Sequence, residues 1–209
     1  ASDVQTLEIY AEDEAGPWGQ PDGSGCGNDI VKEAYAAADQ PVTLIVVPYV
    51  RAKKLVLSGK AVACFGMAWE PELEGKVVFA DQPLYTNAAV IFRQISSPLR
   101  FKDASHFPKG LRLGTVQGYE YPASVHELIA QRRIVPVPSS SEHINLKILA
   151  AGRLDAVVCM ADSLKSANYL LSQAGVEDRV SQAFIMDRSG TYIGFSVSHP
   201  QKDFALKKF

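Results

Sequence analysis

The 209-residue sequence lacks any run of about 18 apolar residues, the length that a membrane-spanning helix requires. Its longest uncharged apolar run, Val42–Val50, suits a strand that leads into a turn. It also lacks an excess of one charge, since 21 basic residues stand against 23 acidic ones along the chain. The composition therefore gives no electrostatic sign of nucleic-acid or membrane binding.

The usual signatures of metal and nucleophile chemistry are missing as well. No CxxC, HxxxH or clustered Cys/His pattern occurs, and the four histidines are scattered at His106, His126, His143 and His199. No Gly-x-Ser-x-Gly, P-loop or dinucleotide-binding fingerprint is present either. We therefore expect no metal site, no cofactor and no catalytic residue.

What is present is a hydrophobic content of 47%, enough for a core in one domain or two small lobes. In the first half, apolar patterns alternate between strands and helices. The predicted strands are Thr6–Ala11, Val42–Val47, Ala61–Phe65 and the short run Val77–Ala80, and the predicted helices are 27–38 and Tyr49–Leu57. Ile30, Val31, Ala34 and Tyr35 form the expected apolar stripe of the first helix. This order is typical of a parallel sheet covered by helices.

The second half repeats the alternation. Predicted strands are Leu111–Val116, Ile134–Val137 and Asp155–Met160, predicted helices are Tyr121–Arg132, 142–151 and Asp162–Ala174, and extended segments are Thr86–Gln94, Ile185–Tyr192 and Tyr192–Ser198. Ser139–Glu142 has the pattern of a capping box. It precedes Ile144, Ile148 and Ala151, which we place on one apolar helical face.

Three short motifs occur in order: Glu70-Pro71-Glu72-Leu73, then Phe79–Tyr85, then Leu149–Val158. Together they resemble the family 3 extracellular solute-binding proteins, the type II periplasmic receptors of amino-acid ABC transporters. The resemblance covers nearly the whole chain. It implies a two-lobe α/β fold in which each lobe is a mainly parallel sheet flanked by helices.

The resemblance also implies where the lobes lie in the sequence. Lobe 1 is expected to be discontinuous, formed by residues 1–91 and 191–209, and lobe 2 to span 95–187. The hinge strands are expected near 92–94 and 188–190. The sequence starts Ala-Ser-Asp-Val-Gln, without a leader, which suits a mature exported protein after removal of a signal peptide; a boundary chosen for expression gives the same start.

Two departures from the family pattern bear on the ligand. Leu73 stands where the family has an arginine, whose planar fork grips an α-carboxylate. The family's amine-binding aspartate is expected roughly where Met160 stands, and Asp162 either replaces it or caps a helix. We therefore expect a small polar or aromatic-bearing ligand and not an ordinary α-amino acid.

Ligands of open α/β sheets bind outside the carboxyl ends of the strands, so the loops there are the candidate site. The predicted ligand-binding residues are Trp18, Tyr49, Arg51, Met67, Trp69 and Glu70 in lobe 1, and Gln117, Gly118, Tyr119, Glu120, Met160 and Asp162 in lobe 2. Each lobe 1 aromatic has the alternative of capping the core of its lobe. Gly118 before a helix is typical of an anion nest, which Glu120 would oppose unless it turns outward.

The function that the resemblance implies is capture of a small molecule by hinge closure, for an ABC permease. One alternative is a periplasmic enzyme similar to cyclohexadienyl dehydratase, with Glu70 and Glu120 as an acid/base pair. Another is a sensor module that hands the signal to a partner protein. In each case we expect an exported, monomeric protein, located in the periplasm or otherwise outside the cytoplasm, with no nucleic-acid partner.

The three cysteines leave one unpaired in any disulfide scheme. Cys26 and Cys64 both fall in lobe 1 and can bond if their Cα atoms lie within about 7 Å. The alternative is that they are buried thiols acting as small hydrophobic residues. Cys159 is expected to be a free thiol in the second lobe.

Overall fold

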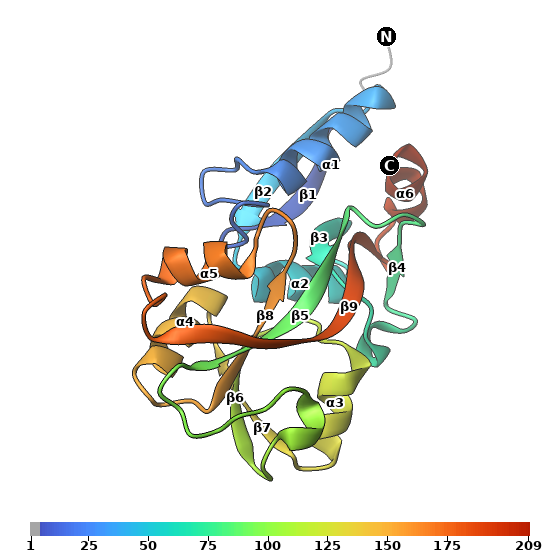
Figure 1. Cartoon of the computed structure of the whole chain (residues 1–209). Helices are drawn as coiled ribbons and strands as arrows, with labels where there is room; N and C mark the ends of the chain where they lie inside the picture. The colour runs from blue at the N-terminus through green and yellow to red at the C-terminus, as the bar shows by residue number, and fades with distance from the viewer. Residues whose placement is uncertain (1–4) are drawn as a thin grey trace. The chain divides into compact units, whose positions relative to one another are not determined.

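The computed structural model describes residues 5–209, which fold into two compact units (Figure 1). The first unit comprises the described residues up to Tyr85 together with Gly190–Phe209, and the second comprises Thr86–Ser189. The chain passes between the units along two long strands, β5 (Tyr85–Gln94) and β9 (Val180–Ser196). The position of a hinge within these strands stays a prediction.

The first unit is a sheet with helices packed against it. Its further elements are β1 (Leu7–Glu12), α1 (Cys26–Ala37), β2 (Val42–Val47), α2 (Tyr49–Leu57), β3 (Ala63–Met67), the 3-10 helix η1 (Pro71–Leu73), β4 (Val77–Phe79) and α6 (Lys202–Lys208). β1 lies between β2 and β3 and pairs with both in parallel. The carboxyl ends of these three strands therefore lie at one edge, while β9 runs antiparallel to β3 and β4.

In the core of this unit, the buried face of α1 differs from the predicted one. Val31 and Tyr35 of α1 are fully buried as expected, but Ile30 is 39% exposed. One turn earlier the buried face continues through Gly27 and Asn28. The predicted stripe was wrong at Ile30 because the helix turns a polar side chain, Asn28, inward instead.

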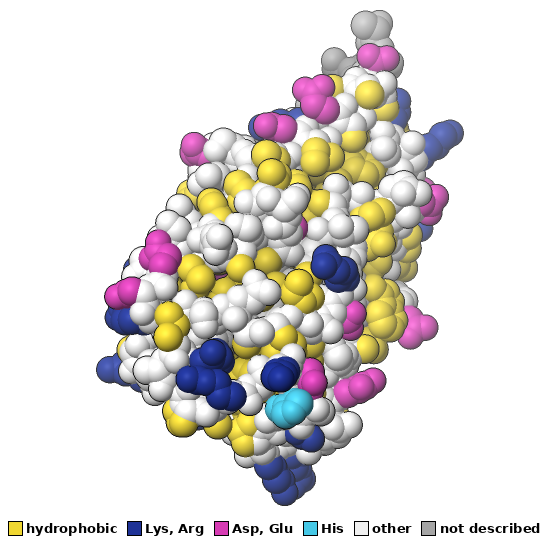
Figure 2. Space-filling view, viewed as in Figure 1, with side chains coloured by type: hydrophobic (Ala, Val, Ile, Leu, Met, Phe, Trp, Pro, Cys, Tyr) yellow, Lys and Arg dark blue, Asp and Glu magenta, His cyan; other side chains and the backbone are white. Residues whose placement is uncertain are grey.

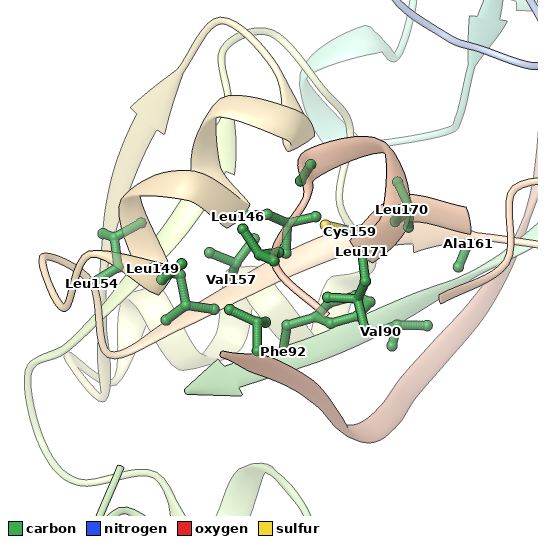
Figure 3. Packing of buried hydrophobic residues seen from close by; sticks show 14 of the residues in the cluster. Val90, Phe92, Leu146, Leu149, Leu154, Val157, Cys159, Ala161, Leu170 and Leu171 are labelled. Carbon is green, nitrogen blue, oxygen red and sulfur yellow. The ribbon is translucent and has the colours of Figure 1, made fainter. Parts of the chain in front are cut away.

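The second unit contains β5, the first part of β9, and elements that alternate along the chain. These are η2 (Ala104–His106), β6 (Leu111–Val116), α3 (Ala123–Ala130), β7 (Ile134–Ser139), α4 (Glu142–Ala150), β8 (Ala156–Ala161) and α5 (Ala167–Ala174). β6 pairs in parallel with β7 and β8, and β5 is antiparallel to β8. One apolar cluster, shown in Figure 3, joins β5 and β8 to α4 and α5, and a second covers the other face of these strands.

α4 begins at Glu142 as predicted, but neither the capping box nor the predicted face is formed. The box is not formed because the carboxylate of Glu142 accepts from the N–H of Met160 and from Lys165. Ser141 caps the helix by accepting a hydrogen bond from the backbone N–H of Ile144 (3.2 Å). Ile144 itself is 38% exposed, whereas Leu146 and Leu149 are fully buried in the cluster of Figure 3. The prediction followed the β-branched residues, while the helix buries its leucines.

The helix predicted from Asp162 begins five residues later. Oδ1 of Asp162 accepts hydrogen bonds from the backbone N–H groups of Leu164 and Lys165, both at 2.8 Å, and so holds a turn. Ser166 then caps α5 by accepting from the N–H of Tyr169 (3.1 Å). Asp162 is therefore a turn residue and not the cap of this helix.

All three cysteines are free thiols, so the Cys26–Cys64 disulfide considered above is not formed. Cys26 is exposed at the start of α1, whereas Cys64 is completely buried within β3. Cys159, expected to be free, is also completely buried. Within residues 5–209, no helix has the length and hydropathy of a membrane span.

Candidate functional site

The lobe 1 residues predicted to bind ligand follow parallel strands that end at the same edge. Trp18 follows β1, Tyr49 and Arg51 begin α2 directly after β2, and Trp69 and Glu70 follow β3. Parallel pairing of the three strands therefore gives one edge an aromatic and charged character, as the loop positions predicted.

These residues differ in how far they are exposed. Trp69 is 58% exposed, which excludes the interpretation that it fills the core. Met67, still within β3, is fully buried and offers no surface to solvent, while Tyr49 is 4% exposed. Arg51 is exposed. The edge thus offers solvent one large aromatic side chain and one cation.

Trp18 is buried against a residue that the sequence did not single out. Its ring stacks on Tyr85, with centroids 3.7 Å apart and planes 9° from parallel. The pair forms part of the wall of a small hollow. This hollow is lined by Glu12, Ala15, Trp18, Gly19, Gly27, Asn28, Phe65, Gly66 and Tyr85. Tyr85 belongs to a motif that was recognised only as a family resemblance, and no local spacing pairs it with Trp18.

Glu70 forms a buried ion pair. Nζ of Lys53, on α2, lies 2.7 Å from Oε1 of Glu70, and both side chains are about one-tenth exposed (11% and 7%). The loop after β3 is thereby tied to α2. Low exposure strengthens such a pair, but it also makes either partner costly to remove.

In the second unit the loop after β6 carries Gln117, Gly118, Tyr119 and Glu120. Gly118 has a φ of +85°, a left-handed conformation that favours glycine. The helix α3 begins only at Ala123, so Gly118 does not directly precede a helix N-terminus as predicted. Glu120 is 5% exposed and does not turn out into solvent. These features do not favour an anion nest at Gly118.

The loop after β8 is anchored by a second buried ion pair. Glu142, the first residue of α4, accepts from the N–H of Met160 through Oε1 (2.6 Å) and from Nζ of Lys165 through Oε2 (2.8 Å). Lys165 ends the turn that Asp162 organises. The ion pair therefore holds the whole segment from Met160 to Lys165 against α4.

Cys159, next to this ion pair, is a weakly nucleophilic thiol. Burial raises the pKa of the Cys159 thiol well above its ordinary value, and the Glu142 carboxylate raises it further, against a smaller opposing effect of Lys165. A thiol with a raised pKa holds little thiolate at neutral pH, and the thiolate is the nucleophilic form.

A wider hollow, of about 340 Å³, lies in the second unit beside Asp162. It is lined by Thr86, Asn87, Ala88, Val90, Ala161, Asp162, Ser163, Ser166, Ala167, Gln182, Ile185 and Arg188. Of these only Asp162 was predicted. Ala161 and Ser163 flank Asp162 at the end of β8, and the others lie along β5, β9 and the start of α5, not in a loop directly after a parallel strand. A rule based on strand ends does not find residues that line the sides of strands.

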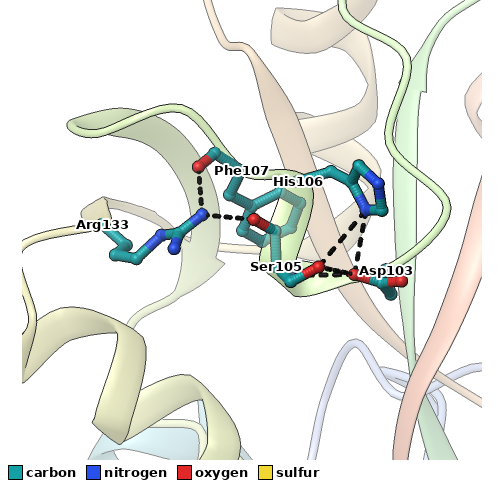
Figure 4. Close-up of polar contacts among 5 residues, drawn as sticks. All are labelled: Asp103, Ser105, His106, Phe107 and Arg133. Carbon is teal, nitrogen blue, oxygen red and sulfur yellow. Dashed lines mark hydrogen bonds and ion pairs between the residues drawn. The ribbon is translucent and has the colours of Figure 1, made fainter.

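One cluster of the second unit resembles a catalytic triad in composition but not in geometry (Figure 4). Oγ of Ser105 and Nδ1 of His106 both bond to Oδ1 of Asp103, and their separation from one another is 3.4 Å. The side-chain hydrogen bond from Ser105, followed by that from His106, lowers the pKa of the Asp103 carboxyl. Arg133 donates to the carbonyls of Ser105 and Phe107, so the cluster fixes η2.

The surface shows no single-sign patch on the face drawn in Figure 2, where acidic, basic and hydrophobic side chains are interspersed. No group of three or more histidine, cysteine, aspartate or glutamate side chains within residues 5–209 is arranged to hold a metal ion.

No family model and no curated protein matches the sequence. Solved structures do match. A histidine kinase sensor domain with similarity to periplasmic binding proteins aligns with a TM-score of 0.80 and 13% identity, covering 98% of this chain and 87% of that one. The substrate-binding protein of an ABC uptake transporter from Streptococcus pneumoniae, with bound histidine, aligns at 0.74 and 18%, covering 97% and 83%.

An ancestral amino acid-binding protein, described as a precursor of cyclohexadienyl dehydratase, aligns with a TM-score of 0.71 and 15% identity, covering 97% of this chain and 86% of that one. At such identities the likeness concerns the fold alone. The chain therefore has the two-lobe α/β fold seen in these periplasmic and solute-binding structures.

Proposed function

We propose that this protein is a solute-binding receptor that captures a small polar or aromatic-bearing molecule between its two units by hinge closure. The observation that carries the proposal is the edge formed by β1, β2 and β3, where Trp18, Tyr49 and Trp69 follow three parallel strands. The second unit has its own such edge after β6 and β8. Ligands of open α/β sheets bind at edges of this kind.

The proposed ligand is not an ordinary α-amino acid. Leu73, at the position of the family's arginine, is 1% exposed within η1 and provides no hydrogen-bond donor. An α-carboxylate taken out of water needs paired donors, and without them its burial costs several kcal/mol, on the order of the penalty for an unpaired ion.

An ABC permease is the partner that we propose, with the protein exported to the periplasm or its equivalent and acting as a monomer. The similarity to a substrate-binding protein of an ABC uptake transporter supports this partner. The similarity to a kinase sensor domain supports a signalling partner in its place. Genes for a permease and an ATPase beside the gene of this protein favour uptake.

Binding without turnover is preferred to the enzyme alternative. An acid/base role for Glu70 requires its carboxylate to exchange protons with a substrate, yet it lies 2.7 Å from the ammonium of Lys53. The similarity to a precursor of a dehydratase supports the enzyme alternative, and the experiment below distinguishes the two.

A thermal-shift screen of polar metabolites tests the proposal, because a solute that binds only the native state raises the melting temperature with concentration. We expect at least one solute to do so saturably and to be recovered unchanged after incubation. Recovery of a converted product would show that the protein is an enzyme and not a receptor. A screen of broad composition without any saturable shift would contradict the binding role.

A further inference from the structure

The even charge balance of the whole chain does not hold for each of its units. Residues 86–189, the second unit, contain 12 lysines and arginines against nine aspartates and glutamates, whereas the rest of the chain contains nine against 14. The second unit is therefore net positive. None of its predicted ligand-binding residues is a lysine or arginine, so the candidate site does not account for the excess.

Part of the excess lies where the parallel strands of the second unit begin. Backbone hydrogen bonds join the turns that lead into β6, β7 and β8: the N–H of Gly110 donates to the carbonyl of Arg132 (3.3 Å), and that of Asp155 to the carbonyl of Arg112 (3.1 Å). Since β6 pairs in parallel with β7 and β8, these turns lie at one edge of the sheet (Figure 1). We call this the basic edge, and its cations are Lys109, Arg112, Arg132, Arg133 and Arg153.

Only some of these cations are neutralised within the unit. Arg112 forms an ion pair with Asp155, the one carboxylate of the three turns. Arg133 is half-buried and donates to the carbonyls of Ser105 and Phe107, which carry no net charge. The remaining three are exposed and form no ion pair within residues 5–209; they are Lys109, Arg132 and Arg153.

The ends of two helices explain part of this arrangement. α3 ends at Ala130 and α4 at Ala150, and the carboxyl end of a helix carries a partial negative charge that nearby cations offset. Arg132 and Arg153 follow these ends, but the effect falls off within the last turn. Lys109 follows no α-helix. The basic edge therefore has more positive charge than the fold itself uses.

β7, the outer strand at this edge, narrows the choice of partner. It contains Pro136 and Pro138, and proline has no N–H, so a strand of another protein cannot complete a regular ladder on it. Val135, in register with Arg112, is 49% exposed. Cations around an exposed apolar side chain are the combination with which peripheral proteins bind anionic phospholipid headgroups.

We propose that the basic edge binds the anionic phospholipid surface of a membrane. Lys109, Arg132 and Arg153 supply the charge attraction, and Val135 enters the headgroup layer. Each lysine or arginine near such a surface contributes about fivefold in affinity, so binding is weak, reversible and lost at high salt. The loops after β6 and β8 lie at the opposite edge and stay uncovered. The inference does not rest on the proposed function.

Co-sedimentation of the whole chain with phospholipid vesicles tests the proposal. Vesicles of equal parts phosphatidylglycerol and phosphatidylcholine should sediment the protein at low salt, and vesicles of phosphatidylcholine alone should not. Changing Lys109→Glu, Arg132→Glu and Arg153→Glu together should weaken binding at least about tenfold. Val135→Ser, which keeps every charge, should weaken it by a smaller factor.

The matched control changes three exposed lysines of the first unit, with the substitutions Lys54→Glu, Lys60→Glu and Lys76→Glu. It alters the net charge equally and should weaken binding less than about threefold, because these lysines lie outside the basic edge. Melting curves show whether each variant folds, and Lys109→Glu alone, with an expected loss of about fivefold, keeps the test valid if the triple variant does not.

Three outcomes would overturn the membrane surface as partner. Equal losses in the two triple variants would show that net charge alone governs binding. Equal binding to neutral vesicles would show that the cations are not needed. Binding of polyglutamate but of no vesicle would assign the basic edge to an acidic protein. None of these results bears on whether a solute raises the melting temperature, so the receptor function is tested separately.

Discussion

At the scale of single residues, Leu73 is the position on which the prediction about amino-acid ligands rests. Its side chain is buried in η1, so even an arginine at this position would have to leave the core before it reached a ligand. We predict that free glycine, glutamine and arginine bind weakly or not at all, as measured by calorimetry. Sub-micromolar affinity for any of them would mean that another cation, such as the exposed Arg51, grips the carboxylate.

Trp69 is the aromatic side chain that the edge of the first unit leaves exposed. We predict that Trp69→Ala weakens solute binding but lowers the free energy of unfolding by less than about 1 kcal/mol, because the side chain is 58% exposed. Trp18→Ala, at a residue only 9% exposed, should cost about 3–5 kcal/mol. Denaturant melts and calorimetry of both variants check this. Full affinity in the Trp69 variant with a collapsed melting temperature would remove Trp69 from the site.

Asp155 couples stability to pH. Arg112 holds its carboxylate with Nη2 (3.0 Å), Nε (3.2 Å) and its backbone N–H (2.8 Å), and the side-chain hydrogen bonds lower the pKa of Asp155. A carboxyl with a lowered folded-state pKa stabilises fully above its unfolded-state pKa, about 3.9, and loses that stabilisation as pH falls through the folded value. Asp155→Asn should therefore cost about 1 kcal/mol at pH 7 and progressively less below about pH 4.

The matched control is Asp178→Asn, since Asp178 is 81% exposed beside Arg179. Urea melts from pH 7 down to pH 2 should show the difference between the Asp155 variant and the native chain closing, and no such trend for the control. A constant difference across this range would show that the ionised carboxylate is not the stabilising form.

The sequence identified the motif that contains Asp155 but not what Asp155 does. Its partner, Arg112, lies 43 residues away, and no local spacing connects the two. The same holds for Tyr85, which stacks on Trp18. It holds also for Asn28, which precedes the predicted apolar stripe of α1 and gave no sign of an inward-facing amide. Contacts between distant segments are set by packing, which periodicity does not describe.

At the scale of secondary-structure elements, sequence periodicity and helix stop signals were sufficient to predict the bounds of several elements. β2, α2 and β6 have the predicted bounds. A β-branched run forms β2, and Gly59 follows the last turn of α2. α5 begins five residues late, because the hydrogen bonds of Asp162 compete with the helix. Most residues of the wider hollow in the second unit were not predicted, because most of its lining comes from the sides of β5 and β9.

The ion pair of Lys165 and Glu142 is predicted to position the loop after β8. Lys165→Met leaves Glu142 buried without its cation and should cost about 3–5 kcal/mol. Adding Glu142→Gln removes that charge while its amide oxygen can still accept from the N–H of Met160, so the double variant should recover part of the loss.

A double-mutant cycle in denaturant melts measures the coupling, and hydrogen exchange of the Met160 amide follows the loop itself. Additive effects of the two changes, with unchanged protection of that amide, would show that the pair does not position the loop.

At the scale of the whole molecule, the alternation of strands and helices predicted the fold class, and the structural neighbours confirm it. The prediction for the extended segments between Ile185 and Ser198 was less accurate. Two separate segments were expected around Tyr192, whereas β9 is one strand of 17 residues that passes through Gly190. A glycine is a common breaker of strands in sequence, but here pairing with β3 and β4 carries the strand onward.

The central claim is that the two units close on a solute, and small-angle X-ray scattering tests it most directly. The solute is the one that gives the largest saturable thermal shift, measured at saturation and in its absence. The account predicts a smaller radius of gyration with solute, as in hinge closure, and a smaller change in the Trp69→Ala variant at the same solute concentration. A solute that saturates the protein while the radius of gyration stays constant would contradict the account.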